Sequence, residues 1–197
     1  MDLSGLLQGQ VGNQLIEGVM SQLGVGEGQA KSAVSAAIPV LMTALNKNAQ
    51  GGGADSLFNA LAKHDGSILD NIGGFLNGGN FSDGAGILSH VLGGSQANVE
   101  NSLSKSSGLS TAQIGKVLMM VAPIVMGYLG RQKQQQSLDS NGLGSLLGDL
   151  IGDAKSSNNS EMSMIEKMLD QNGDGSIMDD VMNLGSKFLG GLFGGSK

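Results

Sequence analysis

The residues best suited to chemistry form an acidic segment near the end of the chain, residues 170–180. Oxygen-bearing side chains alternate along it and a glycine follows, which is how a calcium-binding EF-hand loop begins. Such a loop wraps a hard cation, and many flexible ligands favour Ca²⁺ over Mg²⁺. The candidate ligands are Asp170, Asn172, Asp174, the backbone carbonyl of Ser176, Asp179 and Asp180.

The end of this segment departs from the EF-hand pattern. Position 12 of the loop needs a bidentate acid, and Val181 stands there. The run Asp-Gly-Ser-Ile also occurs at residues 65–68, where Leu61 and Lys63 occupy the corresponding ligand positions. That copy predicts only a turn, with its serine as the cap of the next helix. Two interpretations of 170–180 therefore stay open: an ion site, or a turn with acids at a helix start.

Other candidate groups are fewer. His64 and His90 are the two histidines, and with Asp65 or Asp83 they are candidates for a metal or acid–base site that their spacing does not support. The simpler interpretation of His90, on an apolar helix, is a position at the edge of the core. Nucleophile-elbow and Walker patterns do not occur. We therefore do not expect an enzyme.

The elements that must position these residues are helices. Two apolar runs carry the chain's two prolines, and Pro123 follows Pro39 by 84 residues. At this offset glycines, methionines and leucines coincide, and the start at Ser110 reads as a capping box. An internal duplication is the first interpretation to seek. The two runs predict helices over 27–48 and 111–133, each kinked or broken at its proline.

The pattern as a whole predicts an all-α fold. Apolar residues recur at helical spacing, and no segment alternates long enough for a strand. We expect a duplicated helical unit, each half built round a proline-kinked apolar helix, with glycine-rich loops. The first repeat would cover 1–95 and the second 96–197, with polar linkers at 132–142 and 155–160 and the acidic loop before the last helix.

Composition narrows the class of partner. The net charge of −6 argues against nucleic acid, which needs clustered cations. The one basic cluster, Arg131 and Lys133, fits stabilisation of a helix C-terminus. With 34 glycines and 3% aromatic residues, packing should depend on small side chains and close backbone approach. Core energy would then be modest, which favours a homo-oligomer. No small-molecule substrate is indicated.

The sequence also bears on location. The start of the chain lacks a basic region followed by a long apolar one, so a secretory signal is not expected and the cytoplasm is the default. The uninterrupted apolar runs fall short of the roughly 20 residues that span a bilayer. Peripheral membrane binding through residues 177–195 is an alternative, although interfacial helices usually carry more Lys and Arg than this one.

Several segments together resemble a known family. These are Gly108–Gly130 with Ala-Pro-Ile-Val-Met-Gly-Tyr-Leu-Gly at its end, the Gly/Leu segment 142–152, the acidic segment 170–180, and the tail Phe-Leu-Gly-Gly-Leu-Phe-Gly-Gly over 188–195. They resemble the bacterial domain-of-unknown-function 937 family, which is related to the uncharacterised, all-helical YidB-like proteins. The resemblance implies no activity or catalytic residues. It implies an Asp-rich loop before the last helix, where Asn172 replaces a common Asp.

The sequence thus favours a non-catalytic interaction or structural module that self-associates. Ca²⁺ is the one cofactor it suggests, at 170–180. The alternatives are a calcium-responsive switch, in which the ion orders the last helix, and a peripheral membrane protein.

Overall fold

The computed structural model describes residues 9–157, with side chains as far as residue 151, and every regular element in this part is helical. This confirms the all-α class. Its α-helices are α2 (Gln10–Leu23), α3 (Glu27–Asn48), α4 (Ala54–Ala60), α5 (Ile72–Gly78), α6 (Ser82–Val91), α7 (Gln96–Ser107), α8 (Thr111–Gln135) and α9 (Ser140–Ser157). Shorter helical turns are η1 (Ala49–Gly53), η2 (Leu61–Lys63), η3 (Ser67–Asp70) and η4 (Gly93–Ser95).

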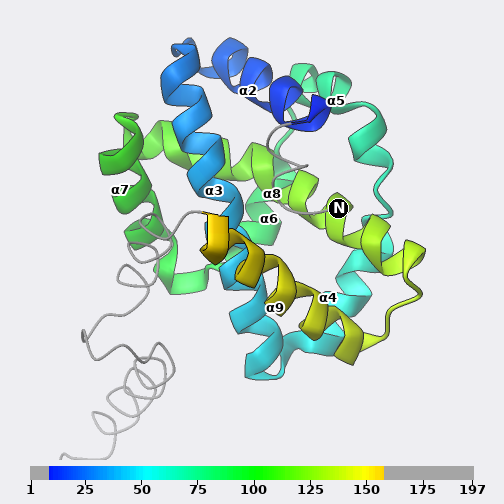
Figure 1. Cartoon of the computed structure of the whole chain (residues 1–197). Helices are drawn as coiled ribbons and strands as arrows, with labels where there is room; N and C mark the ends of the chain where they lie inside the picture. The colour runs from blue at the N-terminus through cyan, green and yellow to red at the C-terminus, as the bar shows by residue number, and fades with distance from the viewer. Residues whose placement is uncertain (1–8, 158–197) are drawn as a thin grey trace, which may run out of the picture. The chain divides into compact units, whose positions relative to one another are not determined.

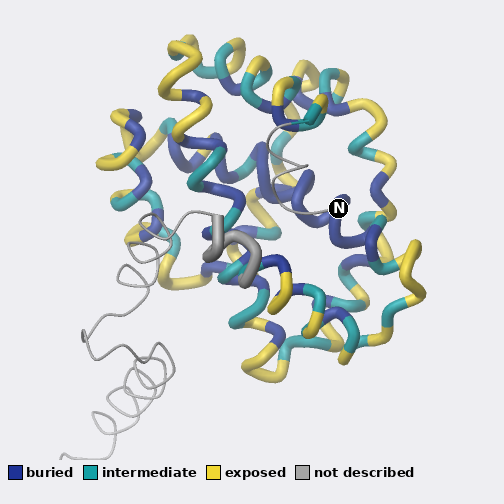
Figure 2. Tube along the Cα trace, in the orientation of Figure 1, coloured by how far each residue is buried: buried dark blue, intermediate teal, exposed yellow. Residues whose placement is uncertain are grey.

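Helix α8 is the centre of the described fold. It passes through the middle of the helices and packs against α3, α6 and α7 (Figure 1). Every residue from Met120 to Gly130 is buried, and the dark stretch in Figure 2 follows this helix. Among the described helices it is the one long and apolar enough to cross a membrane, but 72% of its most apolar stretch is buried among its neighbours. The fold uses it as a core helix.

The two proline helices begin as the sequence predicts. Gly24 and Gly108 have φ values of 63° and 71° and end the helices that precede α3 and α8. This left-handed conformation is the one glycine adopts readily. The capping box of α8 is present, because Ser110 Oγ accepts from the Gln113 N–H at 3.2 Å and Gln113 Oε1 accepts from the Ser110 N–H at 2.9 Å. The internal duplication itself stays a prediction.

Neither proline breaks its helix. Helix α3 continues through Pro39 and α8 through Pro123, while the predicted kinks stay a prediction. Proline has no N–H, so the carbonyl of Met119 lacks its usual partner four residues on. Gly84 of α6 lies directly against that carbonyl, and a Cβ on Gly84 would overlap its oxygen. The absence of a side chain therefore lets α6 approach α8 backbone to backbone.

Glycine brings other segments equally close to α8. A Cβ on Gly130 would overlap the carbonyl oxygen of His64, and one on Gly127 would lie 2.5 Å from Ile68 Cγ2. These contacts place the segment after α4, including η3, directly on the second half of α8. The expectation that packing depends on small residues and close backbone approach is met at these positions.

The expected linkers are shorter in the structure. Of residues 132–142, only 136–139 lie outside helices, because α8 runs to Gln135 and α9 begins at Ser140. Gln and Lys are good helix formers, and Gln136 Nε2 donates to Gln132 Oε1 at 2.9 Å. Of the second expected linker, 155–160, the first three residues belong to α9, and the rest lies outside the described residues.

We predict opposite effects from two alanine substitutions on α6. Gly84→Ala should lower the free energy of unfolding by about 1–3 kcal/mol or more, because its methyl group meets backbone that has no rotamer to change. A methyl group at Gly86, two residues further on, would meet nothing within 4 Å. Gly86→Ala should therefore raise the free energy of unfolding by about 0.5–1 kcal/mol through helix propensity. Urea unfolding followed by circular dichroism measures both. Equal stability of the two variants would contradict the close α6–α8 contact.

Candidate functional site

The predicted ion loop, residues 170–180, lies outside the described residues, and so does the tail 177–195. Its sequence counterpart at 65–68 is described and forms the expected turn. The N–H of Ser67 donates to Asp65 Oδ1 at 2.9 Å, and Gly66 has a φ of 92°. The cap differs from the expectation, because the carboxylate of Asp65 accepts the N–H while Ser67 is already the first residue of η3.

Hydrogen bonding lowers the pKa of Asp65. The largest cause is the backbone N–H of Ser67, followed by the hydroxyl of the same residue, and the charge of Arg131 adds to it. All three favour the carboxylate form. Asp65 therefore stabilises the turn by accepting a hydrogen bond from the backbone two residues on. This role matches one of the two interpretations of 170–180, a turn with acids at a helix start.

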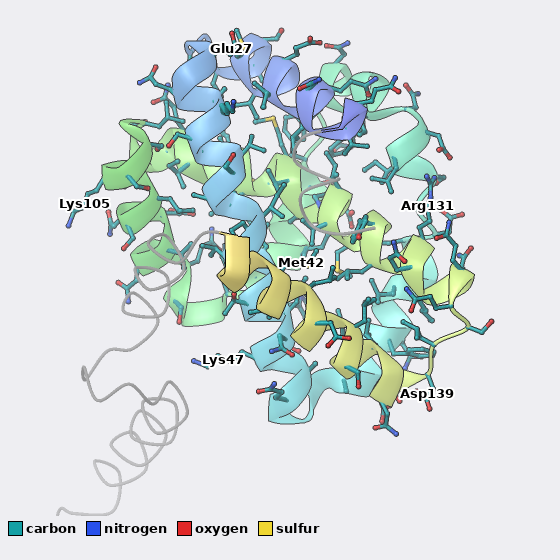
Figure 3. All side chains as sticks on the ribbon, viewed as in Figure 1. Glu27, Met42, Lys47, Lys105, Arg131 and Asp139 are labelled. Atoms are coloured by element: carbon teal, nitrogen blue, oxygen red, sulfur yellow. The ribbon has the colours of Figure 1, made fainter. Side chains whose placement is uncertain are left out.

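The two cations at the end of α8 do more than balance a helix dipole. Arg131 Nη2 donates to the Gly66 carbonyl oxygen at 2.7 Å and to Asp70 Oδ1 at 2.8 Å (Arg131 is labelled in Figure 3). Lys133 Nζ donates to the backbone carbonyl oxygen of Phe58 at 2.9 Å and lies 3.5 Å from the centre of the Phe58 side-chain ring. A lysine over an aromatic face is attracted by the ring quadrupole. These bonds hold η3 and α4 onto α8.

An open pocket of about 820 Å³ lies where α4 faces α6, beside the C-terminal end of α3. Its inner lining includes Leu45 of α3, Leu57 of α4 and Met126 of α8, which are all buried. Ile87 and Val91 of α6 line it as well and are half-buried. Polar side chains from both walls complete the lining: Asn48, Ser56, Lys63, His64, Ser82, Asp83 and His90.

Both histidines belong to this lining. His64 Nδ1 lies 3.9 Å from Asp83 Oδ2, so the segment after η2 faces α6 through an acid and an imidazole. His90 Nδ1 lies 2.9 Å from the Gly86 carbonyl oxygen. A carbonyl only accepts, so Nδ1 carries the proton in this contact and the other ring nitrogen of His90 is left for a ligand.

The described residues of the pocket do not assemble a metal centre. Among the side chains of residues 9–151, no three of His, Asp or Glu lie close enough to hold one ion. Of the weakly supported pairings, the structure brings His64 to Asp83, whereas Asp65 is held in its own turn. The arrangement can offer a ligand an apolar surface, hydrogen bonds and a few charges.

The pocket was not predicted from the sequence, although the spacing of four residues on α6 is a signal for it. Asp83, Gly86, Ile87 and His90 stand at helical spacing, so they share one face of α6. A glycine between an acid and a histidine on that face leaves room beside them. The partner residues on α3 and α4 are separated from α6 by the whole η2–α5 region, and nothing in their local pattern brings them to this face.

Comparison with known proteins adds a family but no activity. No curated protein and no solved structure matches the chain. The family model described as a bacterial protein of unknown function, DUF937, matches residues 5–132. The match spans α2 to most of α8 and so contains the whole pocket lining, whereas segments 142–152, 170–180 and 188–195 of the resemblance lie beyond it. The chain belongs to the DUF937 family of bacterial proteins.

Proposed function

We propose that this protein is a non-catalytic binding module whose ligand occupies the pocket between α3, α4 and α6. The observation that carries the proposal is the composition of the pocket. Buried aliphatic side chains form its inner lining and polar side chains stand on both walls. Small-molecule sites combine these two features, and their usual volume of roughly 300–1,000 Å³ includes this one.

The walls of the pocket are held from the core. Helix α4 is fixed to α8 by Lys133, and α6 is fixed to α8 by the close contact at Gly84. Helix α8 is therefore the common base of both walls. A pocket with fixed walls loses less conformational entropy on binding than one that must be ordered by its ligand.

The chemistry of the lining favours binding over catalysis. His64 faces Asp83 at a distance too long for a good hydrogen bond. His90 is engaged by a backbone carbonyl of its own helix. A base next to a nucleophile, and oriented by a third group, is the signature that a hydrolytic site needs, and these contacts do not form that arrangement.

We predict that the pocket takes up a neutral apolar dye such as N-phenyl-1-naphthylamine, whose fluorescence rises in apolar surroundings. Gly86→Leu should abolish this uptake, because Gly86 lines the pocket and space is open where its side chain would begin. Gly148→Leu on α9, which also meets nothing within 4 Å, is the matched control and should bind as the parent does. Equal dye binding by both variants would rule out this pocket.

We further propose that the chain self-associates. Support comes from the composition, because 34 glycines and few aromatics leave each chain with modest core energy. Light scattering of the full-length protein over a concentration series should give a mass of two or more chains at the higher concentrations. A mass of one chain of 19.9 kDa throughout would contradict self-association.

Calcium binding is a second candidate function, and it is favoured by a difference between two copies of one turn. Where the described turn has Leu61 and Lys63 before its Asp-Gly-Ser run, the later segment has Asp170 and Asn172. Leu61 is buried in the core, so the earlier copy is committed to packing. The later copy carries oxygen ligands at the spacing that a calcium loop uses.

We predict that Ca²⁺ raises the melting temperature of the protein, that Mg²⁺ raises it less, and that EDTA reverses the rise. A ligand that binds only the folded form stabilises it by mass action. The double variant Asp170→Ala/Asp174→Ala should lose the response. Asp65→Ala is the matched control in the other Asp-Gly-Ser turn and should keep it. If the parent protein melts at the same temperature with Ca²⁺ and with EDTA, the calcium proposal fails.

A further inference from the structure

We infer that the ligand of the pocket is a single-chain amphiphile with an anionic headgroup, such as a medium-chain fatty acid. This inference rests on the proposed binding function and adds the chemistry of the ligand. Two features of the lining carry it: the aliphatic character of its apolar side chains and a lysine, Lys63, that makes no ion pair with a described residue.

The apolar lining suits an alkyl chain. Among the described residues it consists of Leu, Ile, Val, Met and Ala side chains together with glycine, without Phe, Tyr or Trp. An alkyl chain needs only aliphatic contact, and each methylene group that it buries improves affinity by about fourfold. Met126, at the inner side, has the pliable side chain that adapts to irregular apolar shapes.

The charges at the polar side favour an anion. Lys63 lines the pocket, and it makes no ion pair with any described residue. By contrast, the two cations at the end of α8 are engaged by the neighbouring segments. In a chain with a net charge of −6, a lysine without an acidic partner beside an apolar pocket is an available site for a carboxylate.

The acid in the lining faces a histidine and not Lys63. Asp83 is the one acidic side chain among the described residues of the lining, and His64 stands beside it at 3.9 Å. The headgroup therefore meets Lys63 while the chain lies along the aliphatic lining.

The test compares three ligands that share one chain and differ in headgroup charge. Decanoate, decanol and decyltrimethylammonium, each below the concentration at which it forms micelles, would displace the neutral dye from the full-length protein. We expect decanoate to bind most tightly and the ammonium compound least. Lys63→Gln should weaken decanoate by up to about fivefold, the upper end of the effect of one exposed charge contact, and leave decanol unchanged. Lys63→Arg should restore the affinity.

Controls separate this inference from the proposed function. Lys105→Gln on α7 removes a lysine that does not line the pocket and should change nothing (Lys105 is labelled in Figure 3). If decanol binds as tightly as decanoate, or Lys63→Gln affects both alike, the pocket binds ligands but the anionic headgroup is wrong. If neither the dye nor any decyl compound binds, the proposed function itself fails.

A second copy of the chain is the other occupant to distinguish. If Gly86→Leu converts an oligomer into a monomer by light scattering, and decanoate does the same, the pocket is an interface between copies and the amphiphile inference is overturned. If Gly86→Leu blocks decanoate while the mass stays the same, the pocket is a ligand site.

Discussion

Close backbone contact with α8 is the constraint on which the described structure depends. Pro123 removes one helical hydrogen bond from this helix, and the carbonyl left behind, on Met119, is covered by Gly84 of α6. The carbonyl of His64 likewise packs directly against Gly130 of α8. Dispersion energy depends steeply on separation, so backbones that meet directly recover part of the packing energy that large side chains supply in other proteins. Few aromatics are then needed to fill the core.

The pocket follows from the same arrangement. Because α6 is held against α8 at Met119 and the η2 segment is held against α8 at Gly130, a space stays open between them, and its described lining has no Phe, Tyr or Trp. Arg131 and Lys133 then fix the outer segments by bonding to backbone carbonyls. Exposed ion pairs contribute little stability, about 0.2–1 kcal/mol. The main effect of Arg131 and Lys133 is to position η3 and α4, and these segments carry or flank one wall of the pocket.

Local sequence patterns predict the helices of this chain well and the site poorly. The starts of α3 and α8 follow from Gly26 and the capping box at Ser110, because these signals act within one turn of helix. The abundance of glycine predicts close packing, yet it does not say that Gly84 meets Met119, since that pairing depends on the path of the chain between them. His64 and Asp83 meet for the same non-local reason.

The contacts at Gly84 and Gly130 also say how this fold can change over evolutionary time. In most cores, a larger side chain at one position can be offset by a smaller one opposite, so pairs of positions drift together. Here the opposite atom is a backbone carbonyl, which every amino acid carries and none can shorten. A smaller side chain elsewhere therefore does not remove the overlap. Gly84 and Gly130 should tolerate substitution less well than the aliphatic residues around them, where volume-conserving exchanges cost little.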